Sequence, residues 1–289
     1  MSQSQVSTPL TRDQAHALVD AVMERDDLAL SASAYEDPAT GEWMFEAMCE
    51  GQPNLEAFAE LARETLGGDV GFDSVQVDPE VNWVAKSLEG LGPVVAGGFY
   101  IHGSHDADPP PAGVTAIRID AAQAFGTGHH ETTAGCLEAI DMLAKRRRFR
   151  RLLDVGTGTG VLAIALAKRL RVPVLATDID AVAVRTAAEN AGDNGVARLV
   201  TTIEADGLDD ARIARGAPYD LIVANILAGP LVSLAPEMAR VAQQGAAIVL
   251  SGLLDAQAPR VQAVYASHGM PLSRKLVRGD WATLVLEKR

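Results

Sequence analysis

The sequence has 289 residues, of which 48% are hydrophobic, so it can build a normal core in one large or two modest domains. Its formal net charge of −13 offers no attraction to nucleic-acid phosphates, so nucleic acid is not expected as a direct partner. We expect no signal peptide and no membrane span, and the two distant cysteines, Cys49 and Cys136, indicate buried thiols in a reducing cytoplasm rather than a disulfide.

The first 79 residues are expected to form a small α+β domain. A capping box of Thr11 and Gln14 predicts a helix to about residue 25, and Asn54 predicts the start of a second helix that ends at Gly67. No catalytic pattern occurs here, so we expect this domain to recognise or position a substrate, with a purely structural role as the alternative. Residues 1–10 are expected to be disordered, strands are predicted at 28–35, 43–49 and 74–77, and residues 80–92 are expected to be a linker with one short helix.

A polar loop near the start of the second predicted domain, residues 93–289, is a candidate functional segment. Residues 124–133 read Ala-Phe-Gly-Thr-Gly-His-His-Glu-Thr-Thr, and they lead into a predicted helix that ends near residue 143. A loop this dense in glycine, threonine and histidine is more often functional than connecting. A metal site is not expected, because Ala134 stands where a His-Glu-x-x-His motif requires its second histidine.

Strands and helices alternate through the second domain. After strands at 94–101 (bent at Gly97 and Gly98) and 114–119, further strands are predicted at 152–155, 174–177, 199–204, 219–224, 246–250, 275–277 and 281–287. The last is expected to be antiparallel to the others, and helices are predicted at 161–170, 181–190, from 228 to about 241, and at 259–268. This alternation predicts an α/β fold: a doubly wound, mostly parallel, seven-stranded Rossmann-like sheet with ligands at the carboxyl ends of its strands.

Polar residues gather where four of these predicted strands end, so they should line one rim of the sheet. They lie at 154–160, 178–180, 204–207 and 225–228. Residues 154–160 read Asp-Val-Gly-Thr-Gly-Thr-Gly, which is a tight glycine turn between a strand and a helix.

The glycine turn and Asp178 indicate a cofactor that carries a ribose. An acid at the end of the second strand suits a ribose diol in nicotinamide and S-adenosylmethionine sites alike. A nicotinamide site would place its third glycine where this chain has Val161, and Asp154 would oppose the pyrophosphate. Asp154 suits an ammonium group instead, which S-adenosylmethionine carries without any phosphate. S-adenosylmethionine is therefore favoured, with NAD as the alternative.

Taken together, these motifs resemble those of the bacterial ribosomal protein L11 methyltransferases (PrmA), within the class I S-adenosylmethionine-dependent methyltransferases. The resemblance covers the second domain as far as the Trp281 strand, whereas the first domain matches only in the order of its elements. It rests on the loop that begins Ala124-Phe125, the Asp154 glycine turn, Asp178-Ile179-Asp180, Ala224-Asn225-Ile226-Leu227-Ala228 and Ser251-Gly252-Leu253-Leu254.

The resemblance implies a protein N-methyltransferase that modifies lysine or N-terminal amino groups of the stalk-base protein of the large ribosomal subunit. We expect it to act in the cytoplasm as a monomer. The implied catalytic residues are Asn225, Ile226 and Leu227, whose side-chain amide or backbone carbonyls would orient the amine. The implied cofactor contacts are Phe125, Gly126, Thr127, Thr133, Asp154, Gly156, Gly158, Gly160, Asp178, Asp206 and Asn225. Glu204 is the alternative to Asp206 for the contact to the adenine amine.

Several alternatives stay open at this point. The chain could be a class I lysine methyltransferase for another protein, a NAD-dependent oxidoreductase, or a binding module without activity. Thr133 and Asp154 could simply cap helices. No strong general base is evident, so His129 or His130 as proton acceptor competes with proton loss to water before the amine is captured.

Overall fold

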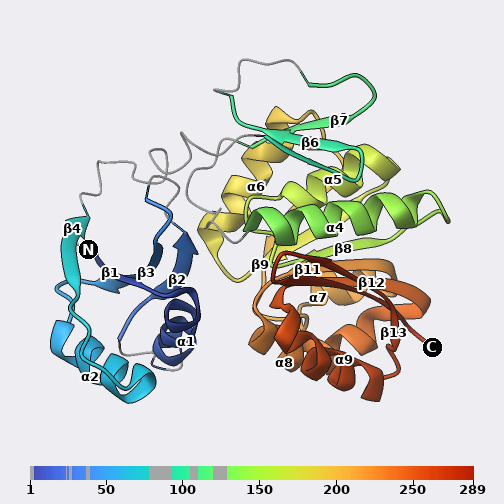
Figure 1. Ribbon diagram of the computed structural model, residues 1–289. Helices are drawn as coiled ribbons and strands as arrows, with labels where there is room; N and C mark the ends of the chain where they lie inside the picture. The colour runs from blue at the N-terminus through green and yellow to red at the C-terminus, as the bar shows by residue number, and fades with distance from the viewer. Residues whose placement is uncertain are drawn as a thin grey trace. The chain divides into compact units, whose positions relative to one another are not determined.

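The computed structural model describes residues 3–23, 25, 28–36, 40–77, 93–104, 110–119 and 129–289. The chain divides into two compact units, Met1–Glu89 and Gly90–Arg289, coloured blue to cyan and green to red in Figure 1. Each unit has hydrophobic core residues of its own, so each is described by itself. The predicted linker, residues 80–92, and the segment 120–128 lie outside the described residues.

In its described residues, the first unit is a four-stranded antiparallel sheet with two helices. The strand order is β2-β3-β1-β4, which together with the order of elements along the chain is a ferredoxin-like arrangement. Phe45 and Phe58 are fully buried and pack edge to face in its core. The elements are β1 (Gln3–Leu10), α1 (Arg12–Met23), β2 (Ser31–Glu36), β3 (Trp43–Glu50), α2 (Leu55–Leu66) and β4 (Asp73–Val77).

The prediction that residues 1–10 are disordered is wrong for residues 3–10, because β1 is an inner strand of this sheet. It pairs with β3 on one side and β4 on the other. Ser4, Val6 and Thr8 alternate into the core and are at most 5% exposed. Two of these three buried side chains are polar, so the strand lacks the apolar alternation that would reveal it in the sequence. The Ser4 hydroxyl is satisfied by donating to the Gly51 carbonyl at 2.7 Å.

The second unit contains a seven-stranded sheet of order β10-β9-β8-β11-β12-β14-β13 and a three-stranded sheet of order β5-β6-β7. In the large sheet β8 to β12 are parallel, and β14 is antiparallel to both of its neighbours, as predicted for 281–287. The strands are β5 (Val94–Ala96), β6 (Phe99–His102), β7 (Thr115–Arg118), β8 (Leu152–Val155), β9 (Val174–Asp178), β10 (Val200–Glu204), β11 (Tyr219–Asn225), β12 (Ala242–Leu254), β13 (Leu272–Arg278) and β14 (Trp281–Glu287).

Helices cover both faces of the large sheet, as the doubly wound pattern predicts (Figure 1). Alternate residues of each strand enter different cores: Leu152 packs with α4 and α5, and Leu153 packs with α8 and α9. The helices are α4 (His129–Ala144), α5 (Val161–Leu170), α6 (Ala181–Asp193), α7 (Ala211–Gly216), α8 (Ala228–Val241) and α9 (Ala258–Ser267).

Two local predictions for this unit need correction. Residues 94–101 were expected to be one bent strand, but β5 and β6 are two antiparallel strands joined by a turn at Gly97 and Gly98. Both glycines have positive φ, which lets the chain reverse within two residues. The short helix α7 has no counterpart among the predicted helices, because Ile213 is its only buried residue and leaves no apolar period to detect.

Cys49 and Cys136 are both free and buried, in agreement with the expectation of reduced thiols. In the described part of the chain, no helix is long and apolar enough to cross a membrane.

Candidate active site

The glycine turn connects β8 to α5 at the carboxyl edge of the large sheet. Gly156, Gly158 and Gly160 all have positive φ, between 54° and 82°, which other residues adopt only at a cost. The Thr157 amide donates to the Thr177 carbonyl at 2.9 Å, so the turn is bound to the end of β9. Residues 156–160 are therefore held in a defined conformation at the rim.

The three glycines of the turn meet different surroundings. A β-carbon on Gly156 would collide with Cγ2 of Ile226, and one on Gly160 would lie 3.0 Å from Cβ of Ala187 on α6. A β-carbon on Gly158 would meet no atom of the described residues within 4 Å. Gly156 and Gly160 thus allow parts of the protein to approach each other, whereas Gly158 borders open space where a ligand could come close to the backbone.

Asp154 is fully buried at the end of β8, below the turn. Its Oδ2 accepts from the Thr157 hydroxyl at 2.7 Å and from the Ala163 amide at 3.0 Å, so the carboxylate does cap the first turn of α5. Its Oδ1 is buried with no partner among the described residues. Burial raises the pKa of Asp154 to about 7, against the opposing effect of the hydrogen bonds from Thr157 and Ala163.

Asp178, the last residue of β9, braces the turn from the neighbouring strand. Its Oδ2 accepts from the Gly158 amide at 2.8 Å, and its Oδ1 accepts from the Asp180 amide at 3.0 Å. A carboxylate has about four lone-pair sites, so these two bonds leave acceptor capacity on each oxygen. Asp178 can therefore order the turn and still accept hydroxyl groups from a ligand.

Asn225, the last residue of β11, meets Thr133 of α4 across the rim. The Asn225 Nδ2 donates to the Thr133 hydroxyl at 3.3 Å, although the two residues lie 92 positions apart in the chain. The Asn225 Oδ1 is buried and has no partner among the described residues. Thr133 lies inside α4 and is 2% exposed, so it does not cap that helix.

The two residues after Asn225 form the passage from β11 into α8. The Ile226 side chain packs at Gly156, and its backbone lies against Gly252, where an added β-carbon would be 2.7 Å from the Ile226 carbonyl carbon. The Leu227 carbonyl accepts from the Leu231 amide at 3.1 Å, and its side chain is 58% exposed. Of the acceptors predicted to orient an amine, the Leu227 carbonyl thus already accepts one hydrogen bond, whereas the buried Asn225 Oδ1 has no partner among the described residues.

The remaining predicted site residues either take no part in these contacts or lie outside the described residues. Asp206 is exposed just after β10, at the same edge of the sheet, with no part in the contacts described above. Phe125, Gly126 and Thr127 lie outside the described residues, and His129 and His130 are described only as the first backbone positions of α4.

Sequence reasoning missed three contributors to the rim: Thr157, Ile226 as a packing residue, and Gly252. Thr157 is one of two threonines that alternate with glycines in the turn, and nothing in the sequence indicates that its hydroxyl donates to Asp154. Gly252 has φ +84° and makes room for the Ile226 backbone, a contact between strand ends that only the sheet order reveals.

A cavity of about 510 Å³ lies away from these residues, along β8 to β10 and α7. None of the predicted site residues that the structure describes lines it. Its four arginines are Arg150, Arg151, Arg212 and Arg215. Arg212 is held by Asp210 through two hydrogen bonds of 3.0 and 2.8 Å, so part of the positive charge is already neutralised.

The sheet order, the single strand antiparallel to its neighbours within it, and the glycine turn with acids at the ends of β8 and β9 define a class I S-adenosylmethionine-dependent methyltransferase. The family model described as "Ribosomal protein L11 methyltransferase (PrmA)" matches residues 7–289. The chain belongs to this family. The predicted resemblance is thereby confirmed, and the oxidoreductase alternative loses its support.

Individual relatives agree with the family match. A ribosomal protein L11 methyltransferase of Rhizobium meliloti is 43% identical over 292 residues and covers the whole of both chains. One of Sinorhizobium fredii is 50% identical over 213 residues, which is 74% of this chain and 73% of the relative. The crystal structure of a ribosomal protein L11 methylase from Lactobacillus delbrueckii subsp. bulgaricus aligns with a TM-score of 0.61 at 30% identity, over 69% of this chain and 100% of that one.

Proposed function

We propose that this chain uses S-adenosylmethionine to methylate lysine or N-terminal amino groups of ribosomal protein L11, with the rim around Asp154, Asp178 and Asn225 as its active site. The supporting observation is a pair of buried oxygens, Asp154 Oδ1 and Asn225 Oδ1, that have no hydrogen-bond partner in the described part of the chain. Buried acceptors of this kind are costly unless a donor reaches them. An ammonium group and a substrate amine are both donors. Cytoplasmic location and a monomeric state stay predictions.

The residues at the rim suit S-adenosylmethionine by their chemistry. The Asp154 carboxylate would meet the ammonium group of the methionine end, directly or through water. The Asp178 carboxylate would accept from the ribose hydroxyls, and Thr133 and the exposed Asp206 would complete the contacts at the methionine and adenine ends. Gly158 leaves the turn open to close approach, because a side chain there would occupy free space. Calorimetry with S-adenosylhomocysteine and with NAD tests this assignment: the first should bind and the second should not.

The chain's own residues would hold a neutral amine in line with the methyl group of the cofactor and exclude water from the site. Bound S-adenosylmethionine supplies a methyl group that its sulfonium has already activated. The Asn225 Oδ1 would accept a hydrogen from the amine nitrogen, so that the nitrogen lone pair points at the methyl carbon. Thr133 holds the Asn225 amide in that orientation. A free lysine has a pKa of about 10.4, so its proton must leave before capture, and we propose that it leaves to water.

The N-terminal unit is proposed to recognise the protein substrate. It has a core of its own, separate from those of the catalytic unit. Its composition contains no catalytic pattern, and a net charge of −13 for the whole chain favours encounter with a basic protein.

Replacing Gly158 with alanine should weaken cofactor binding much more than it weakens the fold. The positive φ predicts a loss of about 1 kcal/mol in the free energy of unfolding, since no atom of the described residues obstructs the new methyl group. The same methyl group would project into the proposed cofactor space. Denaturant unfolding and calorimetry with S-adenosylhomocysteine measure the two effects, and an affinity within about twofold of wild type would contradict the placement of the cofactor at this turn.

Cofactor affinity should rise with pH because of Asp154. Burial raises the pKa of this carboxyl to about 7, and an ammonium group binds its charged form. Affinity for S-adenosylhomocysteine should therefore increase up to about tenfold between about pH 6 and about pH 8. The contribution of Asp154 to stability has the opposite sign: it is full below the unfolded pKa of about 3.9 and is lost as pH rises through the folded value. Calorimetry on wild type and Asp154→Asn checks the predicted rise in affinity with pH. An equal pH dependence of the affinity in both proteins would contradict the prediction.

A further inference from the structure

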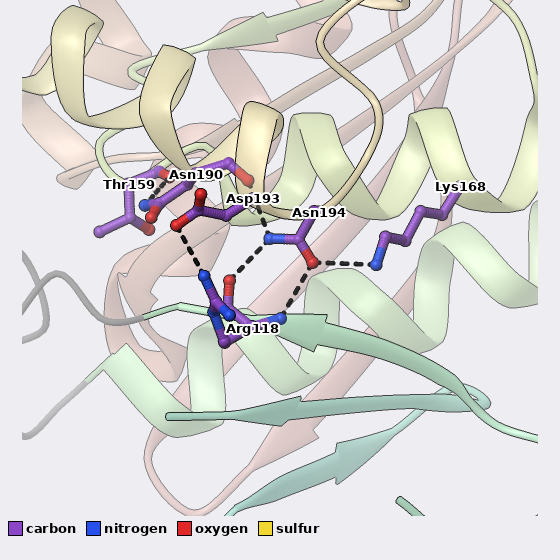
Figure 2. Close-up of polar contacts among 6 residues, drawn as sticks. All are labelled: Arg118, Thr159, Lys168, Asn190, Asp193 and Asn194. Atoms are coloured by element: carbon purple, nitrogen blue, oxygen red, sulfur yellow. Dashed lines mark hydrogen bonds and ion pairs between the residues drawn. The ribbon is translucent and has the colours of Figure 1, made fainter. Parts of the chain in front are cut away.

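The side chain of Asn194, just after α6, makes four hydrogen bonds that join three parts of the catalytic unit (Figure 2). Its Oδ1 accepts from the Arg118 amide at 3.0 Å and from the Lys168 ammonium at 2.9 Å. Its Nδ2 donates to the Arg118 carbonyl at 2.7 Å and to the Asn190 carbonyl at 2.9 Å. The hydrogen-bonding capacity of a side-chain amide is about four bonds, so Asn194 is fully used.

The side-chain amide of Asn194 hydrogen-bonds to β7 in the way that the backbone of a neighbouring strand would. It bonds both the N–H and the C=O of Arg118, the last residue of β7. β7 is an edge strand of the three-stranded sheet, with β6 on its other side. Two bonds to one residue fix the position of the strand end relative to α6. This strand end directly precedes residues 120–128, which lead to α4 and Thr133.

A second link runs from Asn194 to the glycine turn. Asn190 lies one helical turn earlier on α6, and its carbonyl accepts from Asn194. The Asn190 side chain is 7% exposed, and its Nδ2 donates to the Thr159 carbonyl at 2.8 Å. Thr159 stands between Gly158 and Gly160 and is 3% exposed. Figure 2 shows this run of contacts from Arg118 to Thr159.

A third link runs through Lys168 on α5, the helix that begins at the glycine turn. Its ammonium donates to the Ala116 carbonyl of β7 at 2.6 Å as well as to Asn194. These two partners are neutral oxygens, and burial lowers the pKa of Lys168. Both ends of the segment from Thr159 to Lys168 are therefore bound to α6 or β7 through the Asn194 amide and its immediate partners.

We propose that Asn194 is a positioning residue for the cofactor site, acting with Asn190 and Lys168 to hold the glycine turn in its binding conformation relative to β7. The inference rests on the proposed function, which places the cofactor at this turn. Asn194 itself lies at the end of α6 and acts only through its partners. Loss of the Asn194 side chain releases the Arg118 end of β7 and removes one hydrogen bond to Asn190. The glycine turn must then be ordered by the cofactor when it binds, which lowers the affinity for the cofactor.

The test compares Asn194→Ala and Asn190→Ala with wild type by two measurements. In the protein without cofactor, amide hydrogen exchange of residues 156–163 should be about tenfold faster in both variants, since the turn loses a support worth about one hydrogen bond. The KM for S-adenosylmethionine should rise about tenfold, with kcat at saturating cofactor within about twofold of wild type, as expected when only binding is affected.

Asp193→Ala is the matched control. Asp193 precedes Asn194 and pairs with Arg118, but this ion pair is exposed, with side chains 42% and 53% accessible, so its loss should change neither measurement. If Asn194→Ala does not fold, Lys168→Met removes the ammonium contacts and retains the aliphatic stem, and it should show the same two changes.

The proposal is overturned if Asn194→Ala lowers the melting temperature yet leaves turn exchange and KM equal to those of Asp193→Ala, because Asn194 would then be a structural residue only. If the proposed function itself is wrong, the measurements give a different result. In that case wild type binds no S-adenosylhomocysteine, while the exchange rates of residues 156–163 still decide whether Asn194 orders the turn.

Discussion

Replacing Asn225 with alanine is expected to lower kcat for amine methylation about a hundredfold or more. The Asn225 Oδ1, at the end of β11, is a buried acceptor that none of the described residues contacts with a hydrogen bond, and it is the proposed contact that orients the substrate amine. Alanine leaves the amine free to rotate away from the methyl group. Single-turnover rates at saturating cofactor measure this loss directly, because they exclude product release.

Thr133 provides the matched control for this experiment, because its hydroxyl accepts from the Asn225 Nδ2 at 3.3 Å. Thr133→Ser keeps the hydroxyl and should stay within about twofold of wild type, whereas Thr133→Val removes it and should lower kcat about tenfold. An Asn225→Ala variant that keeps more than a tenth of the wild-type single-turnover rate would show that the amine is oriented by another group.

Deleting residues 1–80 is expected to abolish methylation of ribosomal protein L11 while cofactor binding stays intact. The catalytic unit contains every described contact of the glycine turn, Asp178 and Asn225, and its two cores include no residue of the N-terminal unit. Loss of the proposed recognition unit removes the binding energy that brings the substrate amine to the rim, so the rate at low substrate should fall at least about a hundredfold.

Two controls make the deletion interpretable. Affinity for S-adenosylhomocysteine should remain within about threefold of the full-length chain, which shows that the site has folded. A short lysine peptide, which cannot use the N-terminal unit, should react equally slowly with both proteins. Unchanged turnover on ribosomal protein L11 would refute a recognition role for residues 1–80.

Most of the catalytic fold could be predicted from the sequence, because its central strands β8, β9 and β11 are largely apolar and alternate with helices. The antiparallel final strand is one example, and the rim formed by the ends of β8, β9 and β11 follows from strand alternation alone. β1 could not be predicted from the sequence, because two of its buried residues, Ser4 and Thr8, are polar. Their burial follows from the position of β1 between two paired strands.

Local pattern could place the site residues on one rim but could not assign their contacts. The sequence allows Asp154 to be either a ligand contact or a helix cap. In the structure one carboxylate oxygen caps α5, and the other has no partner among the described residues. Asn190 and Asn194 occur in a polar stretch that looks like an ordinary helix end. Their role in bracing the glycine turn depends on β7, which lies more than 70 residues earlier in the chain.

The most direct test of the central claim is mass spectrometry of ribosomal protein L11 incubated with the purified chain and S-adenosylmethionine. The account predicts mass increases of whole methyl groups, located on lysine or N-terminal amines, and none with Asn225→Ala over the same time. The same protein isolated from cells that lack this chain should carry fewer methyl groups than protein from wild-type cells. Unmodified L11 in the presence of bound cofactor, with methyl groups on a different protein, would contradict the proposed function.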